Sequence, residues 1–212
     1  MKKILLILAL LPLLAFDSGE KYLGKIEWYQ KDSYYKQKVY AQHDWKSFYR
    51  LKEAQANIEL FDIDEHLLSA AVFFATNKMR ESKHVKPLQF SHQLRDAAVV
   101  HTNQMIEKGF FDHFNKFTPD LRSPDQRIKL FGIASTALAE NIDRTGSRID
   151  GKTTYLQLAE QIVQDFYDSP PHRKNMLGKE FTHLGCVAVF EQLGHQQWTH
   201  YVKVTQDYSG DY

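Results

Sequence analysis

The sequence predicts an α+β domain in which helices cover a small sheet. Between residues 64 and 168, apolar residues recur at three- and four-residue steps, which is typical of helices with one buried face. After residue 184 the pattern changes to β-rich and alternating segments, which are typical of strands. Helices that precede strands in this way indicate an α+β domain.

Four helices are expected, each between a capping residue and a glycine or proline stop. Ser, Thr and Asp are favoured N-caps, and Gly or Pro commonly ends a helix. The expected N-caps are Asp64, Ser91, Ser123 and either Thr153 or Thr154. The corresponding stops are Pro87, Gly109, Gly132 and the run Ser169-Pro170-Pro171.

Two strands are expected after the fourth helix. The segment 184–190 is β-rich, and the segment 198–208 alternates between two faces. One face of the second strand holds Thr199, Tyr201, Lys203 and Thr205, and the other holds His200, Val202 and Val204. Because the connection 191–197 contains Gly194, the two strands are expected to form an antiparallel hairpin.

The first fifteen residues are typical of a secretory signal peptide. A cationic Met1-Lys2-Lys3 start precedes an apolar run over residues 4–14, and Ala15 offers a small residue for cleavage. The run is shorter than the roughly 20 residues of a membrane-spanning helix, although a short anchor or a buried helix is the alternative. No cysteine follows it, so no lipoprotein-type anchor is expected. After cleavage of residues 1–15, we expect a secreted, periplasmic or cell-surface protein without a transmembrane anchor.

A Tyr-rich extension over residues 16–63 is expected before the main domain, which covers residues 64–212. Residues 20–60 hold six of the eleven tyrosines, and Trp45 and Phe48 indicate a helix with an aromatic edge. Interleaved aromatic and basic residues could stack on bases or sugars. The favoured interpretation is that these aromatic side chains pack on the main domain, because no converging set of polar groups accompanies them.

Composition excludes several classes of protein. The chain has 212 residues, with 27 Lys and Arg against 26 Asp and Glu, so it lacks the basic excess of a dedicated nucleic-acid-binding protein. Its lone cysteine, Cys186, rules out an intrachain disulfide and a zinc cluster built on cysteines. Because Cys186 lies in the first expected strand, we expect a buried, inert thiol.

Three residues could carry chemistry near the ends of helices and strands. His113 and His172 can bind a divalent metal, zinc for example, through neutral imidazole nitrogens, and Glu140 could orient or deprotonate a bound water. Catalytic zinc normally has three protein ligands, so two distant histidines alone are weak evidence for a metal centre. The alternative is that both histidines bond to Glu140 and tie two loops to the core.

A set of short motifs, taken in order, resembles the CAP superfamily of cysteine-rich secretory proteins, antigen 5 and pathogenesis-related-1 proteins. The similar region runs from about residue 67 to residue 208 and contains eight pieces in the family's order and spacing. The pieces are Ala75-Thr76-Asn77-Lys78-Met79-Arg80, Pro87-Leu88-Gln89-Phe90, Ala97-Ala98 with His101 and Met105, Phe111-Asp112-His113, Ala139-Glu140-Asn141-Ile142, Ser169-Pro170-Pro171-His172-Arg173-Lys174-Asn175, Phe181-Thr182-His183-Leu184-Gly185-Cys186 and Thr205-Gln206-Asp207-Tyr208. With one cysteine, the chain resembles the bacterial, disulfide-free type of this domain, also called the SCP domain.

The resemblance implies a three-layer α-β-α sandwich with a large cleft, lined in the family by two histidines and two glutamates. His113, Glu140 and His172 match three of these four residues. Ser169 stands where the second glutamate is expected, and Phe166 stands where the family usually has Trp. The residues that we expect to line the cleft beside them are Asn141, Ser169, Arg173, Asn175 and Gln206.

Three functions are open from the sequence. The favoured one is a secreted or periplasmic binding module whose cleft holds a lipid or a surface polymer, with or without a divalent metal on His113 and His172. The second is a metal-dependent hydrolase or protease with Glu140 as the general base. The third is an envelope protein-interaction module that docks through the Tyr-rich extension. The sequence leaves open whether the chain is an enzyme.

Overall fold

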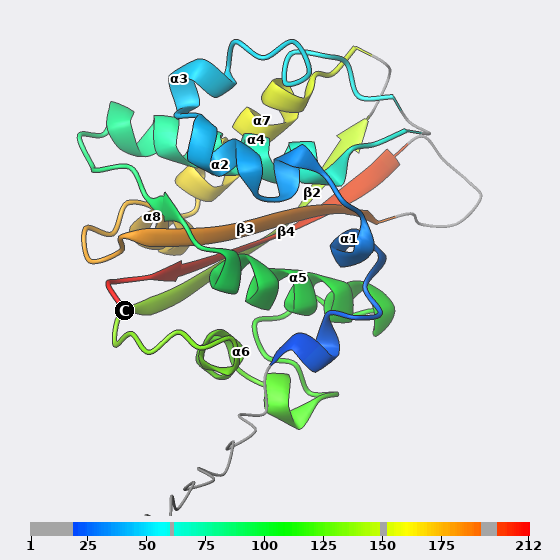
Figure 1. The fold of residues 1–212 in the computed structure, drawn as a ribbon, viewed down its shortest axis with the longest axis vertical. Helices are drawn as coiled ribbons and strands as arrows, with labels where there is room; N and C mark the ends of the chain where they lie inside the picture. Colours follow the sequence, from blue (N-terminus) through cyan, green and yellow to red (C-terminus); the bar gives the residue numbers. More distant parts are fainter. Residues whose placement is uncertain (1–18, 60–61, 149–151, 192–198) are drawn as a thin grey trace, which may run out of the picture.

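A four-stranded sheet lies between two layers of helices, as Figure 1 shows. The computed structural model describes residues 19–59, 62–148, 152–191 and 199–212. The predicted signal peptide and the connection between the two predicted strands fall outside these residues, and both stay predictions. Within the described residues, no helix is long and apolar enough to cross a membrane.

The chain forms short helices first and longer helices and strands later. The extension contains η1 (Gly19–Tyr22), α1 (Glu27–Gln30), η2 (Tyr34–Lys36), α2 (Lys38–Gln42) and α3 (Trp45–Phe48). The main domain contains α4 (Glu65–Ser82), β1 (Gln89–Phe90), α5 (His92–Glu107), η3 (Pro119–Leu121), α6 (Pro124–Leu130), β2 (Leu138–Arg148), α7 (Tyr155–Asp168), α8 (Pro170–Met176), β3 (His183–Glu191) and β4 (Thr199–Ser209).

The four predicted helices are confirmed as α4, α5, α6 and α7, with the expected caps. In each helix a side-chain oxygen accepts a hydrogen bond from a backbone N–H of the first turn, which satisfies a donor that the helix itself leaves free. The capping residues are Asp64, Ser91, Ser123 and Thr154. Gly109 and Gly132 follow α5 and α6 with φ of 65° and 87°, a conformation that favours glycine and ends a helix.

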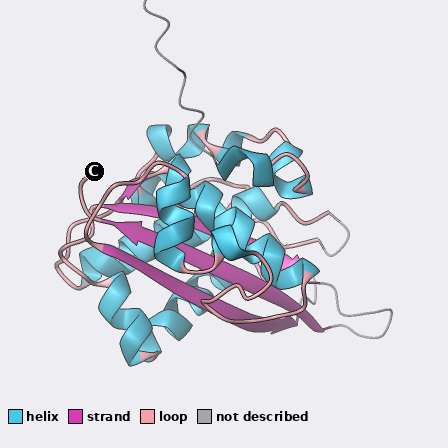
Figure 2. Ribbon diagram, turned by 90° about the horizontal axis from the view of Figure 1, so that it is seen from below, coloured by secondary structure: helices cyan, strands magenta, loops and turns pink. Residues whose placement is uncertain are grey.

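The sheet has the strand order β1-β3-β4-β2, so β4 is an inner strand and β2 an edge strand. The predicted antiparallel pairing of β3 with β4 is confirmed, and β2 pairs antiparallel with β4 along its whole length, from Leu138↔Ser209 to Arg148↔Thr199. Helices α4 and α7 cover one face and α5 covers the other, and the view in Figure 2 shows helices on both sides of the strands. The three-layer sandwich is therefore confirmed.

Strands β1 and β2 and helix α8 are among the elements that were not predicted from the sequence. Strand β2 contains Asn141, Asp143 and Gly146, residue types that are uncommon in strands, and only its pairing with β4 makes it extended. Strand β1 is too short for a periodic signal. Helix α8 begins at Pro170, directly after α7, because proline fits the first turn of a helix as well as it ends one.

Lys203 and Thr205, on the polar face of β4, are buried, whereas the alternating pattern of this strand is typical of a half-buried strand. Helix α5 covers this face. Lys203 is 3% exposed, and its ammonium donates to the carbonyl of Met105 at 3.2 Å and to Glu191 at 2.9 Å. The hydroxyls of Thr205 and Thr102 bond each other at 2.7 Å. These polar groups are tolerated inside because each has a partner.

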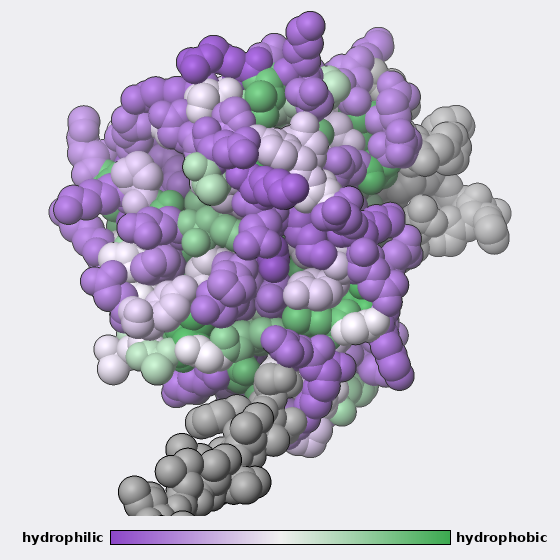
Figure 3. Space-filling view, in the orientation of Figure 1, coloured by the Kyte–Doolittle hydropathy of each residue, from purple (hydrophilic) through white to green (hydrophobic). Residues whose placement is uncertain are grey.

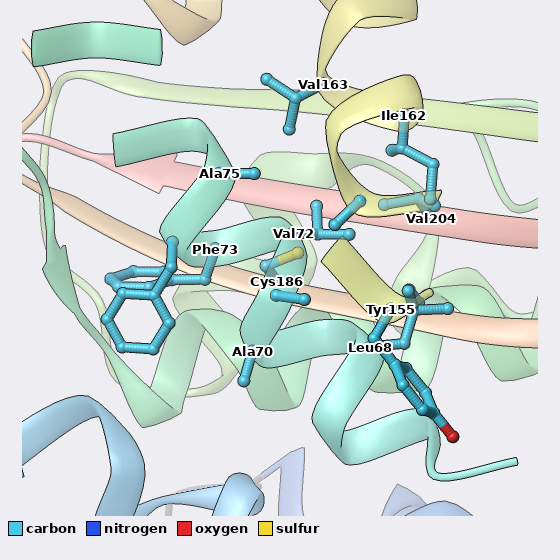
Figure 4. Close-up of a cluster of buried hydrophobic side chains, with 14 of the residues drawn as sticks. Leu68, Ala70, Val72, Phe73, Ala75, Tyr155, Ile162, Val163, Cys186 and Val204 are labelled. Atoms are coloured by element: carbon cyan, nitrogen blue, oxygen red, sulfur yellow. The ribbon is translucent and has the colours of Figure 1, made fainter. Parts of the chain in front are cut away.

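The largest apolar cluster fills the space between α4, α7 and the sheet. Figure 4 shows Leu68 and Val72 of α4 meeting Ile162 and Val163 of α7 over Val204 of β4. Cys186 lies in the same cluster, and burial raises the pKa of its thiol, as expected for an inert cysteine.

The extension packs on the main domain through its aromatic side chains. The ring of Tyr40 stacks on that of Phe90 with centroids 3.7 Å apart, and the ring of Phe48 stacks on that of Phe74 at 4.4 Å. This contact agrees with the favoured interpretation of the Tyr-rich segment. The predicted helix around Trp45 is only four residues long. The boundary between extension and main domain at residue 63 stays a prediction.

Gly185 of β3 allows α5 to approach the sheet at backbone distance. A Cβ atom at this position would lie 1.9 Å from the backbone nitrogen of Arg95 and 2.2 Å from the carbonyl carbon of Leu94. Backbone atoms cannot move away as a flexible side chain can. The packing of α5 on the sheet therefore requires glycine here.

We predict that Gly185→Ala destabilises the protein by about 1 to 3 kcal/mol or more, because α5 must shift away from β3. The measurement is the free energy of unfolding in guanidinium chloride. Gly24→Ala is the matched control, since a Cβ there meets no atom within 4 Å. Equal stability of the two variants would show that α5 does not depend on this contact.

Candidate functional site

The candidate site is built around the buried carboxylate of Glu140, near the start of β2. One oxygen, Oε1, lies 2.8 Å from Nδ1 of His113, and the other, Oε2, accepts a hydrogen bond from the guanidinium of Arg127 at 2.6 Å. The side chains of Glu140 and Arg127 are 1% and 0% exposed. Both carboxylate oxygens are therefore engaged by donors.

The surroundings favour the charged form of Glu140. Burial by itself would raise the pKa of this carboxyl, but the hydrogen bond from His113 and the charge of Arg127 outweigh it and hold the pKa below its usual value. Arg127 also donates to the backbone carbonyl of His113 at 3.0 Å. The guanidinium thus fixes both the carboxylate and the loop that carries the histidine.

His113 presents its second nitrogen to the outside. A carboxylate can only accept, so Nδ1 of His113 carries the proton in the bond to Glu140. In the neutral ring, Nε2 then holds the lone pair that can bind a metal or accept a hydrogen bond. The His113 side chain is 40% exposed, so this nitrogen is accessible to a ligand.

His172 lies on α8, on the other side of the edge strand β2. Its backbone carbonyl accepts a hydrogen bond from Asn141 at 3.1 Å, and its ring meets that of Phe166 edge-on with centroids 5.4 Å apart. Burial lowers the pKa of His172; the carboxylate of Asp143 opposes this change and the neighbouring His113 adds to it. A positive charge on His113 would therefore disfavour a second positive charge on His172.

The buried amide of Asn141 and the half-buried amide of Asn175 hold α8 against β2. Asn175 donates to the backbone carbonyl of Glu140 at 3.3 Å and to the side-chain oxygen of Asn141 at 3.0 Å. Asn141 is 0% exposed, so it supports the site from inside rather than lining an open cleft. The sequence motifs around Glu140 and His172 are therefore brought together by hydrogen bonds between their neighbours.

The other predicted cleft residues lie farther from Glu140. Gln206 is 0% exposed and bonds Thr76 and Tyr208, so its prediction as a cleft-lining residue is wrong. Its alternating position on β4 points it toward α4, which the sequence alone did not show. Arg173 donates to the carbonyl of Tyr167 at 2.8 Å and fixes the corner between α7 and α8. Ser169 is the junction residue between these helices, and its side chain makes no capping bond.

Three buried residues near the site were missed by sequence reasoning. Arg127 looked like an ordinary charged residue of a short helix. His101 of α5 is 0% exposed and has Nε2 at 3.8 Å from Oε1 of Glu140. Asp207 pairs with Glu140 across β2 and β4 and is 0% exposed, with no hydrogen bond to either oxygen from the described residues. Burial, with the Glu140 charge, raises the pKa of Asp207 well above its usual range.

The donor set at this site does not fit a resident catalytic metal. Among the described residues, no group of three or more His, Cys, Asp or Glu side chains could hold a metal ion. Catalytic zinc takes three protein ligands, and Glu140 is already bound by two donors. Of the cavities in the described structure, five have volumes of about 550 to 740 Å³, and none of these five is lined by His113, Glu140 or His172. The large cleft implied by the resemblance therefore stays a prediction.

We predict that His101 makes the folded protein less stable in mild acid. Burial lowers the pKa of His101 to about 4 from 6.5, although the Glu140 charge opposes the shift. The unfolded chain then binds more protons than the folded one between these values, so stability falls as the pH drops from 6.5 to about 4. His101→Gln should reduce this slope by up to about 1.4 kcal/mol per pH unit. The measurement is urea unfolding at a series of pH values, with exposed His92→Gln as the surface control.

We predict that Arg127→Met costs about 3 to 5 kcal/mol of stability, because it leaves the Glu140 charge buried without its partner. Unfolding in guanidinium chloride at pH 7 measures the loss. The double variant Arg127→Met/Glu140→Gln removes both charges and should recover much of it. Lys129→Met on the exposed side of α6 is the control, with an expected change within about 0.5 kcal/mol. A single Arg127 variant as stable as this control would contradict the role of the ion pair.

Solved structures with a similar fold come from extracellular and outer-surface proteins. One is an extracellular Bacillus anthracis protein that contains an SCP domain, with a TM-score of 0.51 and 23% identity over 69% of this chain and 41% of that one. Another is an outer surface protein of Borrelia burgdorferi, with a TM-score of 0.54 and 14% identity over 70% of this chain and 97% of that one. At these identities the likeness supports the fold alone.

The sequence comparisons extend this likeness to a family. The chain is 34% identical over 110 residues to the Bacillus subtilis (strain 168) protein YkwD, which is itself uncharacterized. The match covers 52% of this chain and 38% of YkwD, so the chain spans less than half of that relative. The model of the cysteine-rich secretory protein family, CAP, matches residues 73–208, which include Glu140 and both histidines. The chain therefore belongs to the CAP family of cysteine-rich secretory proteins.

Proposed function

We propose that this protein is a non-catalytic binding module that works outside the cytoplasm and takes its ligand at the surface around His113 and His172. The observation that carries the proposal is the state of Glu140. Both of its oxygens are bound, one to His113 and one to a fully buried Arg127. A general base must accept a proton from water or substrate, but the Glu140 side chain is only 1% exposed, so neither can reach its oxygens from outside. Its arrangement favours a role in orienting His113.

The ligand class that fits the surroundings of His113 is an amphiphile such as a lipid. Phe111 and Phe114 flank His113 in the chain and are 46% and 59% exposed. Apolar rings beside an accessible imidazole nitrogen can contact a hydrocarbon chain and a polar headgroup at the same time. We therefore favour a lipid over a surface polymer. The extracellular and outer-surface neighbours support the location.

His113 and His172 are also the residues that would bind a divalent metal such as zinc, as an exchangeable ion rather than a catalytic centre. Two imidazoles supply two of the four ligands that zinc prefers, so binding should be weaker than at a three-ligand site. Glu140 would act on the metal only through His113, by fixing the tautomer and orientation of its ring. A bound ion would add a positive charge that attracts an anionic headgroup.

We predict weak, saturable zinc binding that is lost in His113→Ala and in His172→Ala. In Glu140→Gln, which keeps the shape of the side chain, the affinity should fall about 10- to 100-fold because His113 loses its orienting carboxylate. Isothermal titration calorimetry on the protein without residues 1–15 measures both effects. His92→Ala, an exposed histidine away from Glu140, is the matched control. Unchanged binding in both histidine variants would exclude this pair as the metal site.

Lipid uptake and hydrolysis separate the binding module from an enzyme. Mass spectrometry of organic extracts from the purified protein should find lipid in the wild type and less in His113→Ala/His172→Ala. Incubation with ester and peptide substrates, with and without zinc, should give no hydrolysis above that double variant. Hydrolysis by the wild type that is lost in Glu140→Gln would contradict the proposal. The proposal would also be contradicted if the extracts contained no lipid and the purified protein took up none from vesicles.

A further inference from the structure

We propose that the loop 110–118 between α5 and η3 is a membrane-docking surface, which inserts Phe111, Phe114 and Phe117 into the outer layer of a lipid bilayer. These three side chains are 46%, 59% and 47% exposed. They are three of the five large hydrophobic side chains that are exposed in the described part of the chain. Figure 3 shows, on the face it presents, that hydrophilic residues cover most of the surface. Three exposed phenylalanines within seven residues therefore form a distinct apolar feature.

The loop holds its phenylalanines outward by its own hydrogen bonds. Asn115 is 1% exposed, and its side-chain oxygen accepts from the backbone N–H groups of Phe117 and Thr118 at 2.9 and 3.1 Å. Its own N–H donates to the carbonyl of Arg122 at 2.8 Å. Asp112 accepts from the N–H of Phe114 at 2.8 Å. The rings are thus presented by a fixed backbone, which lowers the entropy cost of insertion.

The charges near the loop favour a bilayer over a charged partner. Residues 107–122 contain three basic side chains, from Lys108, Lys116 and Arg122, and three acidic ones, from Glu107, Asp112 and Asp120. The formal sum is zero, so no net attraction to a strongly charged surface is expected. Lys116 lies over the ring of Phe117 at 5.3 Å, as a lysine does when its stem follows apolar surface and its ammonium stays in water. Binding should therefore depend on apolar contact and only weakly on salt.

The described chain begins beside η3, the element that follows the loop 110–118. The apolar run at residues 4–14 precedes Gly19, where the described chain begins. Gly19 packs against the ring of Phe131, and the Tyr22 hydroxyl donates to Asp120 at 2.9 Å. In Figure 1, η1 accordingly lies beside η3 and α6. If the run 4–14 is instead the short anchor that the sequence leaves as the alternative, the chain enters its fold beside η3, which directly follows the loop 110–118.

Docking would also bring His113 to the lipid surface, because it stands between Phe111 and Phe114 in the loop. The inference rests on the proposed function for the class of the ligand. A site that binds lipid takes it up more readily when it lies at the bilayer that contains the lipid. The two remain separable. Docking requires only the phenylalanines, whereas ligand uptake also requires His113 and His172, so the histidine variants separate the two.

The test is binding of the protein without residues 1–15 to sonicated phosphatidylcholine vesicles, measured by co-sedimentation. Removing this leader prevents its own apolar run from binding lipid. The triple variant Phe111→Ser/Phe114→Ser/Phe117→Ser should lower the partition coefficient at least about tenfold, because it removes the inserted apolar area. Raising the salt from 0.1 to 0.5 M should change wild-type binding by less than about twofold. Tyr34→Ser/Tyr212→Ser removes two exposed aromatic rings elsewhere and is the matched control.

A second readout keeps the test independent of folding. Circular dichroism melting should show the triple variant folded, since the exposed rings contribute little to the core. A Phe114→Trp variant should bind vesicles as the wild type does, with a blue-shifted emission that brominated lipid quenches. No vesicle binding by the wild type, or equal binding by the triple variant, would overturn the proposal. The proposal would also be overturned if the wild type formed a dimer and the triple variant were a monomer, since the loop would then join two copies of the chain. His113→Ala should bind vesicles normally even where it takes up no lipid.

Discussion

The antiparallel pairing of β2 with β4 is the interaction on which the sheet edge and the candidate site both depend. This register places Glu140 opposite Asp207 and Asn141 opposite Gln206. Neighbouring residues of a strand point to opposite faces, so Glu140 points toward Arg127 and His113 while Asn141 points toward α8 and His172. A shift of one residue would exchange these two faces and separate the carboxylate from its guanidinium.

The polar interior supports the proposal that this site binds a ligand rather than transfers protons. A buried carboxylate is stable only when its charge is matched, and Arg127 and His113 match it here. The same two donors bind both oxygens, and burial keeps water and ligands away from the remaining lone pairs. Asp207 lies opposite Glu140, and a second buried negative charge there would be costly, which agrees with the raised pKa of Asp207. The chemistry available to a ligand is therefore limited to the outward nitrogen of His113 and the ring of His172.

Packing takes the place of disulfides in holding this domain together. The extension closes over α4 through stacked aromatic rings such as Tyr40 on Phe90. Arg80 of α4, 1% exposed, donates to the backbone carbonyls of Met176 at 2.7 Å and Gly178 at 3.0 Å, and so ties α4 to the segment after α8. Hydrogen bonds from one guanidinium to several carbonyls cross-link distant segments as a disulfide would, without requiring an oxidising environment.

The sequence by itself determined the helices, the two periodic strands, the family resemblance and the identity of His113, Glu140 and His172, because caps, stops and periodicity are local properties. Strand β2 could not be predicted, since its residues are extended only by pairing with β4, nor could α8, whose prolines equally indicate a helix end. Gln206 was predicted to line the cleft because it belongs to a motif, whereas the register of β4 points its side chain into the core. The charge balance around Glu140 was decided by tertiary structure alone. Arg127 and Asp207 lie beside Glu140 although they are far apart from each other in the chain. Burial, which the sequence does not show, strengthens their electrostatic interactions with Glu140.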